Sequence, residues 1–137
     1  PKLSAISGVT PALKVYMQLV KGSIKTPQVI HFVRHLLNHI PGPICLFWDN
    51  NSPHKSKLTR ETLAGFAPRL SVYRLPSYAP ELNPDEKVWQ HLKCDALRGF
   101  CPADLTELIN KIHRATRNLR RRPSLVQSFF KDCPLFF

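Results

Sequence analysis

The spacing of hydrophobic positions changes several times along the chain, and each change predicts a new element. Residues 3–9 (LSAISGV) and 13–20 (LKVYMQLV) are short runs rich in strand-forming residues, and Thr10-Pro11-Ala12 favours a tight connection between them. From Pro27 to Ile40 the apolar residues recur at helical spacing, until Pro41-Gly42-Pro43 stops the pattern. The chain is therefore predicted to begin with an antiparallel strand pair and a helix.

The next segments alternate between strand and helix patterns. Residues 44–48 (ICLFW) are a continuous apolar run, which is typical of a strand buried on both faces. A modest helix is predicted around residues 57–66 and a strand at 70–75, and this order of elements favours a right-handed parallel crossover. Helices are then predicted from about Pro84 to Arg98 and over roughly 103–122, where Pro123 breaks the second one. The predicted fold class is α/β.

The amino-acid composition indicates what kind of partner the protein binds. The chain has 20 Lys and Arg residues against 9 Asp and Glu, which gives a net charge of +11. Such a bias indicates a polyanionic partner, and nucleic acid is the commonest one. At 137 residues and 43% hydrophobic content, the chain can build one cored domain, or a piece of one.

The cysteines and the apolar runs indicate in which cellular compartment the protein is expected. No two of the four cysteines form a C-x-x-C pair, so neither a zinc site nor a disulfide framework is indicated. No apolar run approaches the roughly 20 residues that span a bilayer, and the start lacks the apolar core of a signal peptide. We therefore expect a cytoplasmic, DNA-associated protein with reduced thiols and no membrane partner.

Asp49 is the first candidate for chemistry. It stands where the predicted strand 44–48 meets a polar loop, and ligands of open α/β sheets bind at the carboxyl ends of strands. The alternative is that Asp49 and Asn50 only cap a turn, which both residue types do well. His54 lies on the same loop and could contact a phosphate or the attacking water, or be a surface histidine of the turn.

Glu86 is the second candidate. Asn83-Pro84-Asp85-Glu86 reads as a helix cap, a proline at the first helical position and a Glu that completes a capping box, so Glu86 could simply hold the helix start. On a helical wheel, however, Glu86 projects away from the stripe of apolar residues, whereas Asp85 lies nearer its middle. If one of the two binds metal, Glu86 is the better candidate.

Two further groups of polar residues have competing interpretations. His31, His35 and His39 recur every four residues, a spacing that suits a metal, but their face opposite the apolar stripe favours a solvated surface. The arginines from Arg114 to Arg122 either follow a phosphate backbone or form a solvated helix end. We favour DNA contact, and the residues expected to make it are Lys55, Lys57, Lys87, Lys93, Arg117, Arg120 and Arg121.

Two motifs carry a resemblance to a known family. They are W-D-N-x-x-x-H at residues 48–54 and Y-R-L-P-x-Y-A-P-E-L-N-P-x-E-x-V-W at residues 73–89. Over most of its length the chain resembles the catalytic domain of mariner-type DDE transposases, particularly the bacterial insertion-sequence branch. The resemblance implies an RNase H-like fold, a mixed sheet flanked by helices, in which three acids hold two divalent cations.

The resemblance assigns roles to individual residues. Asp49 matches the second acid and Glu86 the third, with 36 residues between them, and Asn50 and His54 become candidates for supporting these ligands. Carboxylates suit Mg²⁺ or Mn²⁺, and two such ions can assist in-line phosphoryl transfer. The implied function is transposition, in which water cuts the element's ends and the resulting 3′-hydroxyl attacks target DNA. The resemblance also allows a homodimer.

The chain departs from the family pattern in two places. It contains no Asp or Glu before Asp49, whereas the family's first acid lies on a first strand in the middle of the sheet. Residues 1–137 are thus expected to be a partial catalytic domain, truncated at its amino terminus and inactive by itself. The alternative function is a non-catalytic, basic DNA-binding remnant. Relatives often carry an apolar or small residue in place of Asp85, which leaves open whether Asp85 contributes to the site.

Overall fold

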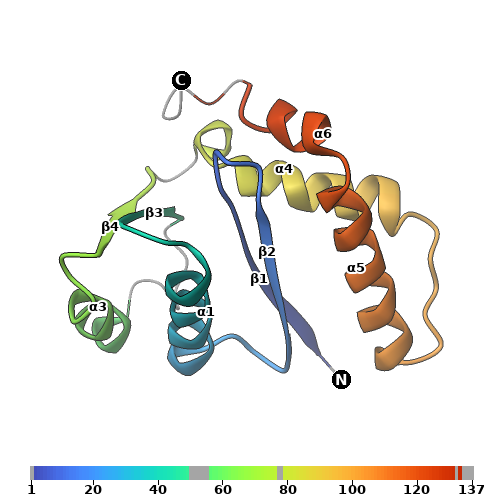
Figure 1. Ribbon diagram of the computed structural model, residues 1–137. Coiled ribbons are helices and arrows are strands. Elements are labelled where there is room, and N and C mark those ends of the chain that lie inside the picture. The colour runs from blue at the N-terminus through green and yellow to red at the C-terminus, as the bar shows by residue number, and fades with distance from the viewer. Residues whose placement is uncertain (1, 50–55, 77–78, 132, 134–137) are drawn as a thin grey trace. The chain divides into compact units, whose positions relative to one another are not determined.

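The computed structural model describes residues 2–49, 56–76, 79–131 and 133. Helices and short strands alternate in it (Figure 1), which confirms the predicted α/β class. A 3₁₀ helix, η1 (Pro80–Leu82), precedes helix α4 (Pro84–His91), and a π-helix, η2 (Leu92–Ala96), extends α4. The other elements, in chain order, are β1 (Leu3–Val9), β2 (Val15–Lys21), α1 (Thr26–His39), β3 (Ile44–Trp48), α3 (Lys57–Ala64), β4 (Leu70–Arg74), α4 (Pro84–His91), α5 (Leu105–Arg120) and α6 (Pro123–Ser128).

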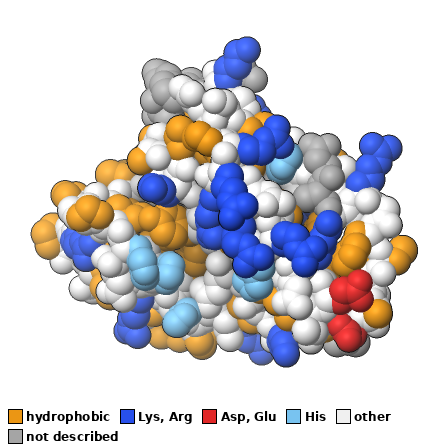
Figure 2. Space-filling view, turned by 45° about the vertical axis from the view of Figure 1, so that its right-hand side comes forward, with side chains coloured by type: hydrophobic (Ala, Val, Ile, Leu, Met, Phe, Trp, Pro, Cys, Tyr) orange, Lys and Arg blue, Asp and Glu red, His pale blue; other side chains and the backbone are white. Residues whose placement is uncertain are grey.

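Basic side chains characterise the outside of the molecule. On the face shown in Figure 2, the blue Lys and Arg side chains cover far more surface than the red Asp and Glu side chains. This distribution agrees with the net charge of +11. Within the described residues, none of the helices combines the length and the apolar character that crossing a membrane requires.

The chain divides into two compact units. The helical unit combines Ser7–Leu19 with Pro80–Phe137, and the crossover unit combines Lys2–Ile6 with Val20–Ala79. Strands β1 and β2 each contribute residues to both units. The described strands form two separate two-stranded sheets, β1 with β2 and β3 with β4.

Strands β1 and β2 form the predicted antiparallel pair. At the turn, the backbone N–H of Thr10 donates to the carbonyl of Lys14 (3.0 Å) and that of Leu13 to the carbonyl of Thr10 (2.8 Å). At the other end, the backbone N–H of Gly22 donates to the carbonyl of Lys2 (2.8 Å). Gly22 has φ +100°, a left-handed conformation that suits glycine, so the chain can leave β2 with a sharp bend.

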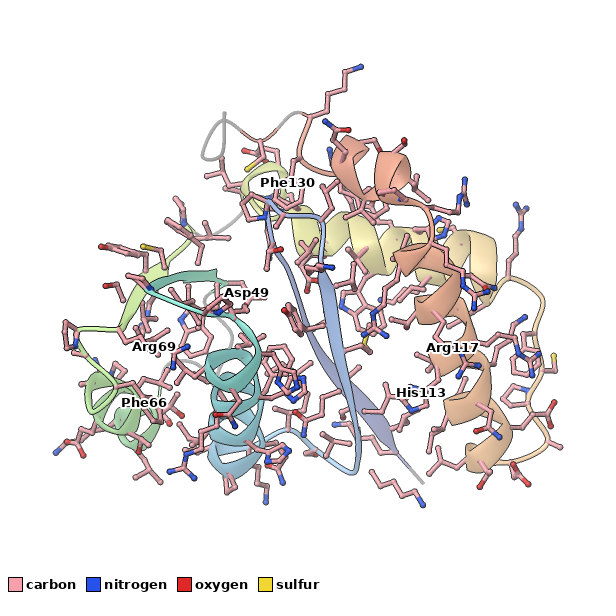
Figure 3. All side chains as sticks on the ribbon, viewed as in Figure 1. Asp49, Phe66, Arg69, His113, Arg117 and Phe130 are labelled. Atoms are coloured by element: carbon pink, nitrogen blue, oxygen red, sulfur yellow. The ribbon has the colours of Figure 1, made fainter. Side chains whose placement is uncertain are left out.

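The crossover unit contains the parallel pair that the sequence predicted. Strands β3 and β4 are parallel, in a register that runs from Ile44 opposite Leu70 to Trp48 opposite Arg74. Arg69, labelled in Figure 3, precedes β4 and donates to three carbonyls at and after the end of α1: Leu37 (2.5 Å), Ile40 (2.6 Å) and Gly42 (3.1 Å). The bonds to Leu37 and Ile40 satisfy carbonyls that the end of a helix leaves without partners. The core of the unit consists of Val29, Ile30, Val33, Leu37, Trp48, Leu63 and Leu70.

Strand β3 differs from its prediction in one respect. Ile44, Leu46 and Trp48 alternate along the strand and pack in the core with residues of α1 and α3. On the other face Cys45 is exposed, and Phe47 stacks on Tyr73 of β4 with ring centroids 5.3 Å apart. The expectation of burial on both faces is therefore wrong: among the described residues, α1 and α3 pack on the face of Ile44, Leu46 and Trp48, and Cys45 on the other face is exposed.

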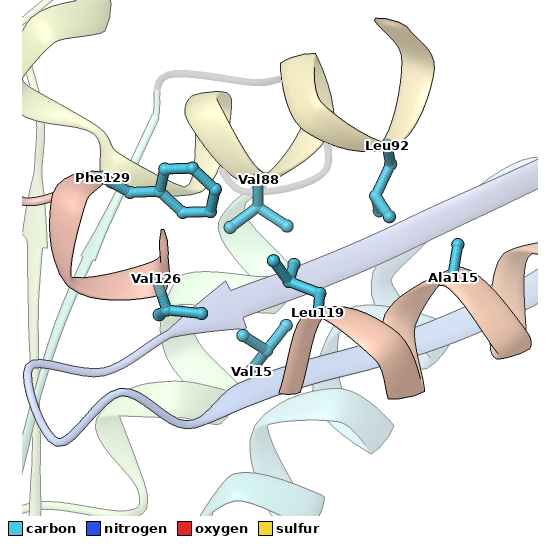
Figure 4. Close-up of a cluster of buried hydrophobic side chains, with 7 residues drawn as sticks. All are labelled: Val15, Val88, Leu92, Ala115, Leu119, Val126 and Phe129. Atoms are coloured by element: carbon cyan, nitrogen blue, oxygen red, sulfur yellow. The ribbon is translucent and has the colours of Figure 1, made fainter. Parts of the chain in front are cut away.

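The helical unit has a core of its own, shown in Figure 4. Val88 and Leu92 come from α4 and η2, Ala115 and Leu119 from α5, Val15 from β2, and Val126 and Phe129 from α6 and the residue after it. Val88, Leu92 and Val126 are fully buried. Pro123, expected to break the helix, does end the α5 segment and also begins α6. One apolar cluster therefore holds both α4 and α5.

Candidate functional site

Asp49 follows directly after β3, and its side chain is half-buried (Figure 3). The backbone N–H of Leu75 donates to the carbonyl of Trp48 (2.8 Å), so the parallel pairing of β3 and β4 continues up to the residue before Asp49. Trp48 and Leu75 are both buried. Asp49 therefore follows the end of a strand that is hydrogen-bonded and buried. This is the position that the sequence predicted for it. The supporting residues Asn50 and His54 lie outside the described residues.

Glu86 lies in the first turn of α4. The Asn83 side chain caps this helix by accepting from the backbone N–H of Asp85 (3.2 Å), and Pro84 takes the first helical position, as predicted. The capping box does not form: the backbone N–H of Asn83 donates to the carbonyl of Pro80 (3.0 Å) rather than to Glu86. The Glu86 side chain is exposed, and within the described residues its carboxylate takes no part in the cap. Its carboxylate is available for another role.

Asp85 points the other way, into the helical unit. Its Oδ2 accepts a hydrogen bond from Ser7 Oγ of β1 (2.7 Å), and Ser7 Oγ in turn accepts one from Trp89 Nε1 (2.7 Å). The three side chains are part-buried, and they connect β1 to the first two turns of α4. Asp85 therefore fixes the start of the helix, while its neighbour Glu86 faces outward.

The two candidate ligands belong to different units: Asp49 to the crossover unit and Glu86 to the helical unit. Each is placed by the elements of its own unit. Among the residues that the structure describes, no group of three or more His, Cys, Asp or Glu side chains could hold a metal ion. Asp49 and Glu86 nevertheless offer hard carboxylate oxygens, the donors that Mg²⁺ and Mn²⁺ prefer.

The basic residues expected to contact DNA occur in both units. Lys57, in the first turn of α3, has its Nζ 3.7 Å from Glu61 Oε1, an exposed pair that contributes little to stability. Lys93 of η2 is exposed and Lys87 of α4 is half-buried. Arg117 and Arg120 are exposed on α5, and Arg121 is exposed at its end. Lys55 lies outside the described residues.

Helix α5 also carries a hollow that sequence reasoning missed. A cavity of about 430 Å³ is lined by Asn110, His113, Arg114, Arg117 and Arg120. Figure 3 labels His113 and Arg117 on this helix. The missed residues are Asn110 and His113. Asn110 precedes Arg114 by four residues and Arg117 by seven, and His113 precedes Arg117 by four. This helical spacing was the signal that could have found them.

The three histidines of α1 form the solvated face that the sequence favoured. All three are exposed, and His39 Nδ1–H donates to the carbonyl of His35 (2.8 Å). The small part of the His35 side chain that is buried, together with the positive charge that His39 and His31 can carry, lowers the pKa of His35 below its usual value of 6.5. The neutral form is therefore favoured, so this residue opposes folding increasingly as the pH falls below 6.5.

Comparison with known proteins supports one family. Residues 1–109 match the family model of the DDE superfamily endonucleases. A search of curated proteins finds no match to this chain. The matched residues include Asp49, Glu86 and the whole of both motifs, and the α/β fold is consistent with an RNase H-like nuclease. The chain belongs to the DDE superfamily of endonucleases.

Proposed function

We propose that this chain is part of the catalytic domain of a mariner-type transposase from the bacterial insertion-sequence branch, and that its substrate is DNA. The observation that carries the proposal is Glu86. In a chain of an endonuclease family, this carboxylate stands exposed in the first turn of α4, while Asn83 and Asp85 provide the local structure. The specific P-E-L-N-P-x-E-x-V-W run supports the mariner-type assignment.

Asp49 and Glu86 are proposed to hold divalent metal, Mg²⁺ or Mn²⁺, in a two-ion site. Bound metal would stabilise charge on the attacking and leaving oxygens of a phosphodiester. The strand end before Asp49 and the capped start of α4 fix the backbone from which each carboxylate extends. Asn50 and His54 are proposed to support the ligands, and Lys55, Lys57, Lys87, Lys93, Arg117, Arg120 and Arg121 to hold DNA.

Mn²⁺ binding tests the two ligands. We expect Asp49→Asn or Glu86→Gln to weaken Mn²⁺ binding to the 137-residue chain at least tenfold, because each replaces a charged oxygen ligand by a neutral amide. A tenfold loss corresponds to about 1.4 kcal/mol. Binding can be followed by the change in water-proton relaxation that bound Mn²⁺ causes.

Glu81→Gln is the matched control. Glu81 is an exposed carboxylate in η1, close to Glu86 in sequence, and it is no proposed ligand. This variant should bind Mn²⁺ as the original chain does. Equal losses in Glu81→Gln and Glu86→Gln would show that Mn²⁺ responds only to overall charge.

We further propose that the 137 residues alone do not cut DNA. They supply matches to two of the family's three acids, since no Asp or Glu precedes Asp49. Supercoiled plasmid incubated with the chain and Mn²⁺ should stay supercoiled on an agarose gel. Nicking that requires metal and disappears in Glu86→Gln would contradict this proposal.

The alternative function is a basic DNA-binding remnant without chemistry. It is favoured by the net charge of +11 together with the two-acid count. In that case Mn²⁺ binding should be negligible in the original chain and in both ligand variants, while DNA binding persists.

The remaining proposals concern the domain organisation, the oligomeric state and the cellular location of the protein. We propose that residues 1–137 belong to one partial catalytic domain, since β1 and β2 each contribute to both units. We also propose a homodimer, as the resemblance allows, and a cytoplasmic location, since the proposed substrate is DNA. The four cysteines are free, with Cys133 buried, as suits a reducing compartment.

A further inference from the structure

Helix α5 separates its side chains into two faces. Ile112, Ala115, Thr116 and Leu119 are buried, so one face of the helix is anchored in the helical unit. Asn110, His113, Arg114 and Arg117 follow the helical repeat on another face, and with Arg120 they line the cavity of about 430 Å³. We call this cavity the α5 pocket.

The α5 pocket is strongly positive. Three of its five lining residues are arginines, and the sequence contains no Asp or Glu between Glu107 and Asp132. In the described part of the chain, no ion pair involves these three arginines. Like charges three and four residues apart repel each other and destabilise a helix. An anion in the pocket would reverse this repulsion.

Stabilisation of the helix end explains only part of this cluster. Cations in the last turn interact favourably with the helix dipole, and Arg117 and Arg120 occupy that turn. Arg114, His113 and Asn110 lie before the last turn, where the dipole effect has faded. The helix dipole therefore explains the positions of Arg117 and Arg120, but it does not explain why Arg114, His113 and Asn110 line the same pocket.

Arg120 is held in place before any ligand arrives. Its Nε donates to the carbonyl of Val15 (2.9 Å), and Val15 is buried in the core beneath α5. The planar guanidinium can present its other N–H groups in a fixed fork that matches a phosphate group. A donor fixed in this way loses less freedom on binding than a free side chain does.

We propose that the α5 pocket binds a phosphodiester group of the DNA backbone. Arg114, Arg117 and Arg120 would neutralise the phosphate, and the Asn110 side chain can add a hydrogen bond. The five lining residues begin at Asn110, just after the segment 1–109 that matches the family model, so the match does not assign this site. The inference rests on the proposed DNA substrate but requires no metal.

The test measures binding of a fluorescently labelled DNA duplex to the 137-residue chain by anisotropy, with EDTA present. We expect Arg114→Ala and Arg117→Ala each to weaken binding about five- to tenfold. Each should also reduce the slope of log affinity against log salt by about one, as the loss of one phosphate contact predicts. Arg98→Ala is the matched control: it removes the same charge from an exposed turn outside the pocket and should change affinity less than twofold.

Arg114→Lys tests whether binding requires the geometry of the guanidinium group or only its positive charge. Lysine keeps the charge but loses the forked donor geometry, so affinity should be restored only in part. Circular dichroism of each variant checks that the helices are retained. Equal losses in Arg98→Ala and Arg117→Ala, full rescue by lysine, displacement of DNA by equimolar pyrophosphate, or no DNA binding at all would each overturn the proposal.

Failure of this inference is distinguishable from failure of the metal proposal. Asp49→Asn and Glu86→Gln should not weaken DNA binding in EDTA, and Arg114→Ala should retain its Mn²⁺ affinity. A chain that binds no Mn²⁺ but loses DNA binding in Arg114→Ala would support the α5 pocket and refute the metal site. The opposite pattern would refute the α5 pocket and leave the metal site intact.

Discussion

Truncation of Leu119 to alanine is expected to lower the free energy of unfolding by about 2–5 kcal/mol, the range typical of buried Leu to Ala changes. Leu119 is 1% exposed and lies among Val15, Val88 and Val126 in the core of the helical unit (Figure 4). The loss combines the transfer of the removed methyl groups with the cavity that remains. Urea denaturation followed by circular dichroism would measure it.

The same change should also affect both proposed sites. Leu119 joins α5, which carries the α5 pocket, to α4, which carries Glu86. Near the unfolding midpoint of the variant, DNA and Mn²⁺ binding should weaken together. Leu58→Ala provides the control, because Leu58 is 61% exposed on α3 and should cost little. A cost below 1 kcal/mol for Leu119→Ala would contradict the packing described here.

Ser7→Ala is expected to cost about 1–3 kcal/mol, because it removes a hydroxyl that serves two part-buried partners. The indole N–H of Trp89 loses its acceptor, and the Asp85 carboxylate loses a donor. Both partners lie on α4, so the start of that helix should become less well fixed. Urea denaturation measures the stability, and Mn²⁺ affinity reports on the position of Glu86.

Ser128→Ala is the control for this prediction. The Ser128 hydroxyl is exposed and donates only to the nearby carbonyl of Leu125, so its loss should change stability by no more than about 0.5 kcal/mol. Equal stability of Ser7→Ala and Ser128→Ala would mean that the connection from Ser7 to α4 contributes nothing. Ser7→Thr, which keeps the hydroxyl, should restore most of the loss.

The sequence predicted most of the fold because its strongest signals are local. The run ICLFW, bounded by Pro43 and Asp49, predicted the bounds of β3, and Pro84 predicted the start of α4. Pro123 was expected only to break a helix, and the helix α6 that it begins was not predicted. The π-helix η2 was not predicted. There the backbone N–H of Leu97 donates to the carbonyl of Leu92 (2.8 Å), five residues back, and no apolar period distinguishes this from an ordinary helical turn.

The candidate site was less predictable, because it depends on contacts between distant residues. The helical wheel separated Glu86 from Asp85 correctly, as exposed and inward side chains. It could not show that Ser7, 78 residues away, is the partner that draws Asp85 inward. The α5 pocket was missed for a related reason: a row of basic residues indicates a charged face, but only the folded helix shows that the face is hollow.

The division of the core has a consequence for spectroscopy. The chain contains two tryptophans, and each unit has one: Trp48 is buried in the crossover unit and Trp89 is part-buried in the helical unit. Each indole should emit at longer wavelength when its own core opens to water. In Trp48→Phe the fluorescence reports only on the helical unit, and in Trp89→Phe only on the crossover unit. The molecule thus contains a separate built-in optical probe for the unfolding of each half.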